Sequence, residues 1–185
     1  HQAVYLQRLI DAGDTRWSIS GANIRPDMAE VVAALEAQSG RYTLETVSPA
    51  GEYRYEEISA IREVLPWEPS LAKVIARGAA PSTRIVSFTV TEAGYYLDDK
   101  GRLDLSFPDL AADVERARRG ESGETEGKGV TIYGAVCAIL RARKATNAGP
   151  LTLLNCDNLR HNGDRFRAGL LEFIELAGDA DLLAW

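Results

Sequence analysis

Amide, carboxylate and imidazole side chains gather between residues 155 and 162, directly after a predicted β-strand. The strand is expected at residues 151–154, which are mostly leucine, and a helix pattern with apolar residues at i, i+4, i+7 and i+8 begins at Phe166. In open α/β folds, ligands bind at the carboxyl edge of the sheet, where strands give way to helices. Residues 155–162 therefore form the first candidate site.

The amide of Asn158 has the chemistry to stabilise a reacting oxygen. A carboxamide donates a hydrogen bond without changing its own charge, which suits an oxygen that gains negative character during hydride or acyl transfer. The alternative is that Asp157, Asn158 or Asn162 caps the following helix by accepting its first N–H groups. His161 is either a general base, because imidazole titrates near neutral pH, or a partly exposed polar residue.

A second candidate site is predicted at residues 23–27, Asn-Ile-Arg-Pro-Asp, at the end of a strand expected over 17–24. In a dinucleotide-binding fold, an acid at this place accepts hydrogen bonds from the ribose hydroxyls of adenosine, and Asp27 is a candidate for that role. The alternative is that Asp27 and Glu30 begin a helix as a capping box. Arg25 lies beside Asp27, so a ribose that carries a phosphate remains an alternative ligand.

The third candidate group, Thr89, Thr91 and Glu92, follows another predicted strand. Residues 84–91 are nearly continuously apolar, as expected of a strand that is covered on both faces. Threonine hydroxyls followed by Gly94 suit the close approach of a cofactor. A strand that merely ends in a turn gives the same pattern.

The order of predicted elements favours an α/β fold. Strands alternate with helices, which indicates a mainly parallel, doubly wound, Rossmann-like sheet. A turn signal at 49–52 separates two strands, so that an antiparallel β-hairpin insertion is expected. The strands of the hairpin are predicted at residues 42–47 and 53–61, and helices at residues 1–13, 26–40, 71–76, 107–118 and 130–143.

Composition narrows the class of protein. A length of 185 residues predicts one domain, and the net charge of -6 gives no reason to expect nucleic acid or an anionic membrane as partner. Cys137 and Cys156 lack the spacing of a metal or redox pair, so they are interpreted as two buried thiols in a reducing compartment, without a metal site. No apolar run approaches the roughly 20 residues that a membrane span needs. A cytoplasmic protein is predicted.

The phosphate-binding turn of a Rossmann fold is missing. No G-x-G-x-x-G follows a predicted strand, and the glycines between residues 120 and 129 lie in a charged loop without a strand before them. The chain also opens inside a helix pattern at His1, without a start signal. We expect that a first strand and its glycine-rich turn belong upstream of His1.

Several segments, taken together, resemble a known family. The sequence is similar to the polyol-specific long-chain dehydrogenases, the mannitol dehydrogenase family, over essentially all 185 residues. The CDN-x-x-x-NG element is the most specific of these segments. Residues 40–49, 65–67 and 151–162 look most like the D-arabinitol 4-dehydrogenases of the family. The segments that carry the resemblance to the family as a whole are residues 1–6, 21–25, 89–96 and 156–163.

The resemblance implies a function and a domain arrangement. Residues 1–185 would be the truncated N-terminal dinucleotide-binding domain of an NAD-dependent polyol dehydrogenase that oxidises D-arabinitol to D-xylulose. Asn158 matches the asparagine of the family's oxyanion hole, and Asp27 falls in its ribose-recognition segment. The catalytic lysine would come from an absent C-terminal helical domain, so the fragment alone is expected to be inactive.

Alternative functions remain open both within the family and outside it. Within the family, the alternatives are a mannitol 2-dehydrogenase and a fructuronate or tagaturonate reductase, whose substrates are polyols, ketoses or hexuronates. Outside the family, the alternative is a non-catalytic Rossmann-like binding module. The substrate pocket would lie mostly in the absent domain, so the sequence alone does not separate the members of the family.

Overall fold

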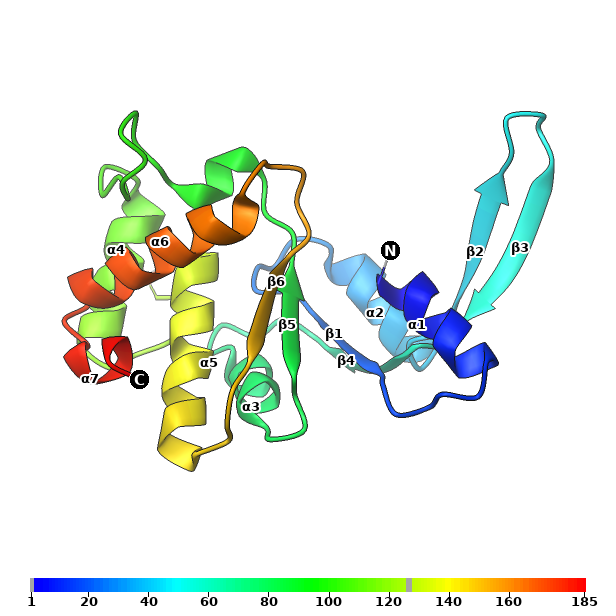
Figure 1. Ribbon diagram of the computed structural model, residues 1–185, viewed down its shortest axis with the longest axis horizontal. Coiled ribbons are helices and arrows are strands. Elements are labelled where there is room, and N and C mark those ends of the chain that lie inside the picture. Colours follow the sequence, from blue (N-terminus) through cyan, green and yellow to red (C-terminus); the bar gives the residue numbers. More distant parts are fainter. Residues whose placement is uncertain (1, 126–127) are drawn as a thin grey trace. The chain divides into compact units, whose positions relative to one another are not determined.

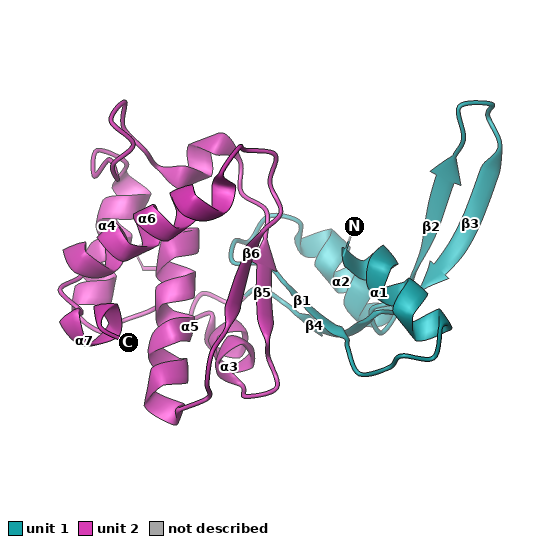
Figure 2. Cartoon of the chain, viewed as in Figure 1, with its two compact units in different colours: residues 1–67 teal, residues 68–185 magenta. Residues whose placement is uncertain are grey.

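The computed structural model describes residues 2–125 and 128–185. His1 and the middle of the loop predicted between residues 119 and 129 lie outside the described residues. The chain divides into two compact units, His1–Trp67 and Glu68–Trp185 (Figure 2). Each unit is described by itself below.

The first unit contains a parallel strand pair, an antiparallel hairpin and two helices (Figure 1). The turn of the hairpin places Gly51 at φ 80°, and the Gly51 N–H donates to the carbonyl oxygen of Ser48 at 2.9 Å. The hairpin is therefore confirmed with the predicted turn. The elements are α1 (Gln2–Asp11), β1 (Ile19–Ala22), α2 (Ala29–Ala37), β2 (Tyr42–Val47), β3 (Tyr53–Ile58) and β4 (Ile61–Leu65).

The prediction of one strand over residues 53–61 is wrong at its end. β3 stops at Ile58, and β4 begins at Ile61 and pairs in parallel with β1. A residue far away in the sequence stabilises this break. The side-chain oxygen of Gln7 accepts a hydrogen bond from the Ser59 N–H at 2.6 Å. Ala60, in the break, is fully buried. The chain thus leaves the hairpin and enters the parallel pair within two residues.

The second unit places a parallel strand pair against helices. Its elements are α3 (Ala72–Ala79), β5 (Ile85–Phe88), the 3-10 helix η1 (Glu92–Tyr95), α4 (Pro108–Arg118), α5 (Ile132–Thr146), β6 (Thr152–Asn155), α6 (Asn162–Leu176) and α7 (Ala180–Leu183). β5 and β6 run in register from Ile85 opposite Thr152 to Phe88 opposite Asn155. Together with the hairpin, the two parallel pairs confirm a mainly parallel α/β fold with an antiparallel insertion.

Aromatic rings fill the core behind β5. The ring of Phe166 on α6 lies 4.6 Å from that of Phe88 and 5.2 Å from that of Tyr133, measured between centroids. Only one face of the pair is covered in this way, because exposed and half-buried residues alternate along both strands. The expectation that residues 84–91 are covered on both faces is wrong for the described structure, in which Ile85 is 46% exposed.

A buried arginine fixes the amino ends of β5 and β6. Arg143, on α5, is fully buried. Its guanidinium donates to carbonyl oxygens just before each strand, at distances of 3.0–3.2 Å. The acceptors are Gly78, Ala80 and Thr83 before β5, and Ala148, Gly149 and Pro150 before β6. Since the two strands are parallel, this clamp also aligns their carboxyl ends.

The helices of the described chain are short. α5 and α6, with 15 residues each, are the longest among the described residues. None of the described helices has both the length and the apolar character needed to cross a lipid bilayer. The short helix α7 was not predicted, and Asp179 caps it by accepting the Leu182 N–H at 2.9 Å.

Candidate functional site

The carboxyl ends of β5 and β6 bring two predicted segments to one edge. The Cys156 N–H, directly after β6, donates to the carbonyl oxygen of Phe88, the last residue of β5, at 2.8 Å. The loop from β6 to α6 and the chain from β5 to η1 therefore leave the pair side by side, as Figure 1 shows. Thr89, Thr91 and Glu92 lie on one of these segments and Asn158 on the other.

The loop after β6 is held by a network around one carboxylate. Asp157 accepts a hydrogen bond from the Tyr95 hydroxyl at 2.7 Å through Oδ2. Its Oδ1 accepts from Asn162 Nδ2 at 3.0 Å and from the Leu159 N–H at 3.3 Å. Asn155 Nδ2 completes the network by donating to the Tyr95 hydroxyl oxygen at 3.1 Å. Both strand exits are thus tied together through polar side chains.

The charge state of the network follows from its surroundings. The pKa of the Tyr95 hydroxyl is raised to about 12, mainly by burial and next by its hydrogen bond to Asp157. For Asp157, burial raises the pKa, but the hydrogen bonds from Tyr95, Asn162 and Leu159 outweigh it and lower the pKa below its ordinary value. At neutral pH the contact is therefore a neutral phenol that donates to a charged carboxylate, a strong class of hydrogen bond.

Asn158 differs from the residues around it. Its side chain is exposed, and within the described part of the chain no hydrogen bond engages its carboxamide. Asp157 Oδ1 and the Leu159 N–H close a turn around Asn158, so its backbone is fixed while its amide stays available. The interior position that would exclude contact with a ligand is therefore not observed for Asn158.

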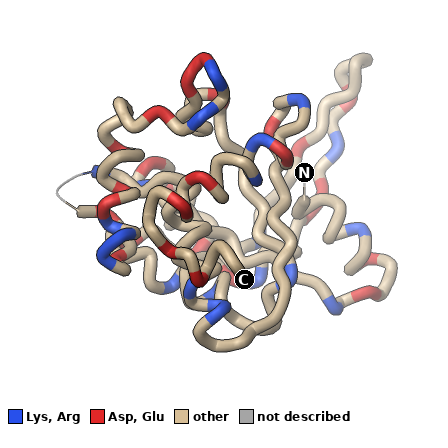
Figure 3. Tube along the Cα trace, turned by 60° about the vertical axis from the view of Figure 1, so that its left-hand side comes forward, with Lys and Arg blue, Asp and Glu red and all other residues tan. Residues whose placement is uncertain are grey.

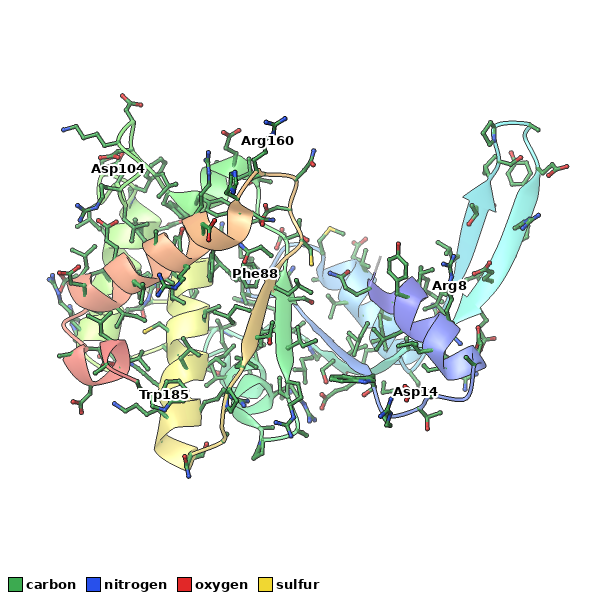
Figure 4. All side chains as sticks on the ribbon, in the orientation of Figure 1. Arg8, Asp14, Phe88, Asp104, Arg160 and Trp185 are labelled. Atoms are coloured by element: carbon green, nitrogen blue, oxygen red, sulfur yellow. The ribbon has the colours of Figure 1, made fainter. Side chains whose placement is uncertain are left out.

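Of Asp157, Asn158 and Asn162, the three residues proposed as alternative caps of the following helix, the first two do not cap it. α6 begins at Asn162, and the residue before it, His161, has φ 57° and gives no side-chain cap. Asn162 alone accepts a helix N–H, that of Gly163 at 2.8 Å. His161 is exposed, and its Nδ1 lies 3.8 Å from Asp164 Oδ2. The loop that carries these residues can be found in Figure 4 by the label of Arg160.

The segment after β5 borders a hollow. Thr89, Thr91 and Glu92 are exposed. A hollow of about 700 Å³ begins at Glu92 and continues along Tyr95, Tyr96 and Leu159. A Cβ on Gly94 would lie 3.3 Å from that of Val90, so a larger residue there would need Val90 to move by a few tenths of an ångström. The structure therefore gives Gly94 a role that needs no cofactor.

The site predicted at residues 23–27 lies in the first unit, after β1. Asn23 Nδ2 donates to the carbonyl oxygen of Asp27 at 2.8 Å and to its Oδ1 at 3.1 Å. Asn23 Oδ1 accepts the Arg25 N–H at 3.3 Å. α2 starts at Ala29, after Met28 in a left-handed conformation, so the capping-box interpretation of Asp27 is wrong. Arg25 and Asp27 are exposed.

The prediction that both cysteines are buried holds for one of them. Cys137 is buried as expected, and burial raises the pKa of its thiol to about 11. The prediction that Cys156 is buried is wrong. Residue exposure alternates along β6, and Cys156 continues the exposed side of Thr152 and Leu154.

Charge is mixed over both units. Lys and Arg are interspersed with Asp and Glu along the trace in Figure 3. Among the described residues, no three His, Cys, Asp or Glu side chains are grouped to hold a metal ion.

Sequence reasoning missed three residues that shape these sites. They are Asn23, Tyr95 and Arg143. Tyr95 contacts Asp157 across 62 positions, and Arg143 contacts Gly78 across 65. A local pattern cannot reveal such pairs. Asn23 was inside the quoted segment, and an amide four residues before an acid was the signal that could have shown its role.

Comparison with known proteins identifies the family of the chain. The mannitol dehydrogenase Rossmann domain family matches residues 1–185. The chain is 53% identical over 185 residues to D-arabinitol 4-dehydrogenase of Klebsiella pneumoniae and 54% identical over 188 residues to that of Ralstonia nicotianae, strain ATCC BAA-1114 / GMI1000. Both matches cover 100% of this chain, which spans 38% of the length of each relative.

A solved structure has the same fold. It is that of Pseudomonas fluorescens mannitol 2-dehydrogenase in ternary complex with NAD and D-mannitol. The TM-score is 0.86 at 32% identity, over 100% of this chain and 36% of that one. The family match covers every residue, and the sequence and structural matches are consistent with it. The chain therefore belongs to the mannitol dehydrogenase family, as its Rossmann domain.

Proposed function

We propose that these residues are the N-terminal, NAD-binding part of a cytoplasmic polyol dehydrogenase that oxidises D-arabinitol to D-xylulose. The identity of 53–54% to two D-arabinitol 4-dehydrogenases supports this substrate. The observation that carries the proposal is the exposed carboxamide of Asn158, without a hydrogen-bond partner in the described chain, on a loop that Tyr95 and Asn162 hold through Asp157.

Asn158 acts on the hydroxyl oxygen of the polyol. Its amide donates to this oxygen and stabilises the negative charge that the oxygen gains as its proton leaves. A carboxamide does not take up a proton at ordinary pH, so the base must be another group. We place it outside these 185 residues, in a C-terminal helical domain, as the family resemblance implies.

Exposed polar side chains of each unit are assigned to NAD in this proposal. The carboxylate of Asp27 is bound by Asn23 through Oδ1, which leaves lone pairs for ribose hydroxyls. Thr89, Thr91 and Glu92 are exposed at the carboxyl edge of β5 and offer polar contacts to the rest of the dinucleotide. NAD, when bound, supplies the acceptor for the hydride. Arg25, beside Asp27, is the residue that would favour a phosphorylated ribose.

Turnover by the full-length protein tests this function. We expect NADH formation with D-arabinitol, at a higher kcat/KM than with D-mannitol, and D-xylulose as the product. A preference for D-mannitol, or reduction of a hexuronate, would reassign the substrate within the family. NAD binding without turnover of any of these compounds would instead show a non-catalytic binding module.

A further inference from the structure

The side chains beneath Asn158 form a continuous connection from the core to the loop. Tyr95 is 2% exposed and belongs to the cluster that contains Leu110, Tyr133 and Phe166. Its backbone is also held, because the Tyr133 hydroxyl donates to the Tyr95 carbonyl oxygen at 3.2 Å. The Tyr95 hydroxyl is therefore a fixed point at the edge of a packed core.

The connection continues from Tyr95 to Asp157. The Tyr95 hydroxyl donates to Asp157 Oδ2 at 2.7 Å, and the other carboxylate oxygen spans Asn158 to reach the Leu159 N–H. Asn162 binds the same carboxylate from the start of α6. Asp157 is thus held from two elements and in turn fixes the backbone on both sides of Asn158.

We propose that Tyr95 and Asp157 are positioning residues that hold the amide of Asn158 in place for the reacting oxygen. This inference rests on the proposed function, because it assigns Asn158 to that oxygen. Neither residue needs to touch the substrate for this role. Oriented donors act only when their geometry is kept, and a displacement of about 1 Å can cost about 100-fold in rate.

Two substitutions separate this role from general packing. Tyr95→Phe keeps the ring in the core and removes only the hydroxyl that joins Asn155 to Asp157. Asp157→Asn keeps the shape of the side chain but replaces one accepting oxygen by a donor. Glu175→Gln is the matched control, because Glu175 is exposed on the same helix and lies outside the network.

The test is a double-mutant cycle on the full-length protein. Each positioning variant is made with Asn158 and with Asn158→Ala, and kcat, KM and the thermal midpoint are measured for all. We expect Tyr95→Phe and Asp157→Asn to lower kcat by about 10-fold or more while the KM for NAD changes little. In the Asn158→Ala background, the same changes should alter kcat by less than about 2-fold, since no amide is left to position.

Every outcome decides between the two proposals. If Asn158→Ala lowers kcat but Asp157→Asn and Tyr95→Phe leave it unchanged, or multiply their losses with that of Asn158→Ala, the positioning role is wrong and the function stands. If Asn158→Ala itself leaves kcat unchanged, the role of Asn158 is wrong and the positioning role is wrong with it. Should Asp157→Asn not fold, Tyr95→Phe alone decides the matter, because its ring still fills the core.

Discussion

Replacing Arg143 by methionine should destabilise the second unit more than any exposed substitution. Methionine fills part of the space of the arginine stem but donates no hydrogen bond. Six carbonyl oxygens before β5 and β6, those of Gly78, Ala80, Thr83, Ala148, Gly149 and Pro150, would lose their charged donor, and the contacts to Gly78 and Ala148 are fully buried. The change therefore tests whether this clamp holds the strand pair on which the candidate site is built.

The expected cost follows from these contacts. A buried acceptor left unsatisfied costs about 1–3 kcal/mol, whereas water can replace the donor at the four acceptors that are only partly buried. The two buried acceptors, those of Gly78 and Ala148, therefore set the expected cost of Arg143→Met at about 2–6 kcal/mol. That is a large part of the about 5–15 kcal/mol by which native domains are stable.

Urea unfolding of the full-length protein measures this cost. Arg167→Met is the matched control, because Arg167 is exposed on α6, and its cost should stay within about 0.5 kcal/mol. Arg143→Lys should be intermediate, since an ammonium is a compact donor without the planar fork of arginine. An Arg143→Met variant as stable as Arg167→Met would refute the argument.

Three further predictions concern single side chains. Asp27→Ala should raise the KM for NAD by about 10-fold with little change in kcat, because uniform binding is lost; an unchanged KM would remove Asp27 from the cofactor site. A thiol reagent should label Cys156 in the folded protein and spare Cys137, which peptide mass spectrometry can check. Burial alone would raise the pKa of Asp179, but hydrogen bonds from Arg141 and Leu182 outweigh it and lower that pKa. The pKa of Asp179 in the folded protein thus lies below that in the unfolded chain. Its contribution to the free energy of unfolding is therefore present above about pH 4 and is lost on acidification. Asp179→Asn should cost about 1 kcal/mol at neutral pH and less in acid, as measured by urea unfolding.

The sequence predicted those elements whose signals are local. The apolar spacing from Phe166 gave α6, and the turn at residues 49–52 gave the hairpin between β2 and β3. The alternation of strands and helices gave the mainly parallel class. Each of these signals lies within a few residues of the element it predicts, so one sequence suffices to find them.

The features that were mispredicted depend on distant contacts. The end of β3 is decided by Gln7, 52 residues before Ser59. The burial of β5 depends on which of its faces the helices cover, and an apolar sequence does not show this. Asn158 could be proposed from its residue type and place after a strand, but the support from Tyr95 arises only in the folded chain.

The kcat of Asn158→Ala in the full-length protein tests the central proposal most directly. Loss of one oriented donor to a developing negative charge should lower kcat for D-arabinitol by about 100–1,000-fold, with the thermal midpoint nearly unchanged because the side chain is exposed. A kcat equal to that of the parent protein would contradict the assignment of this amide to the reacting oxygen.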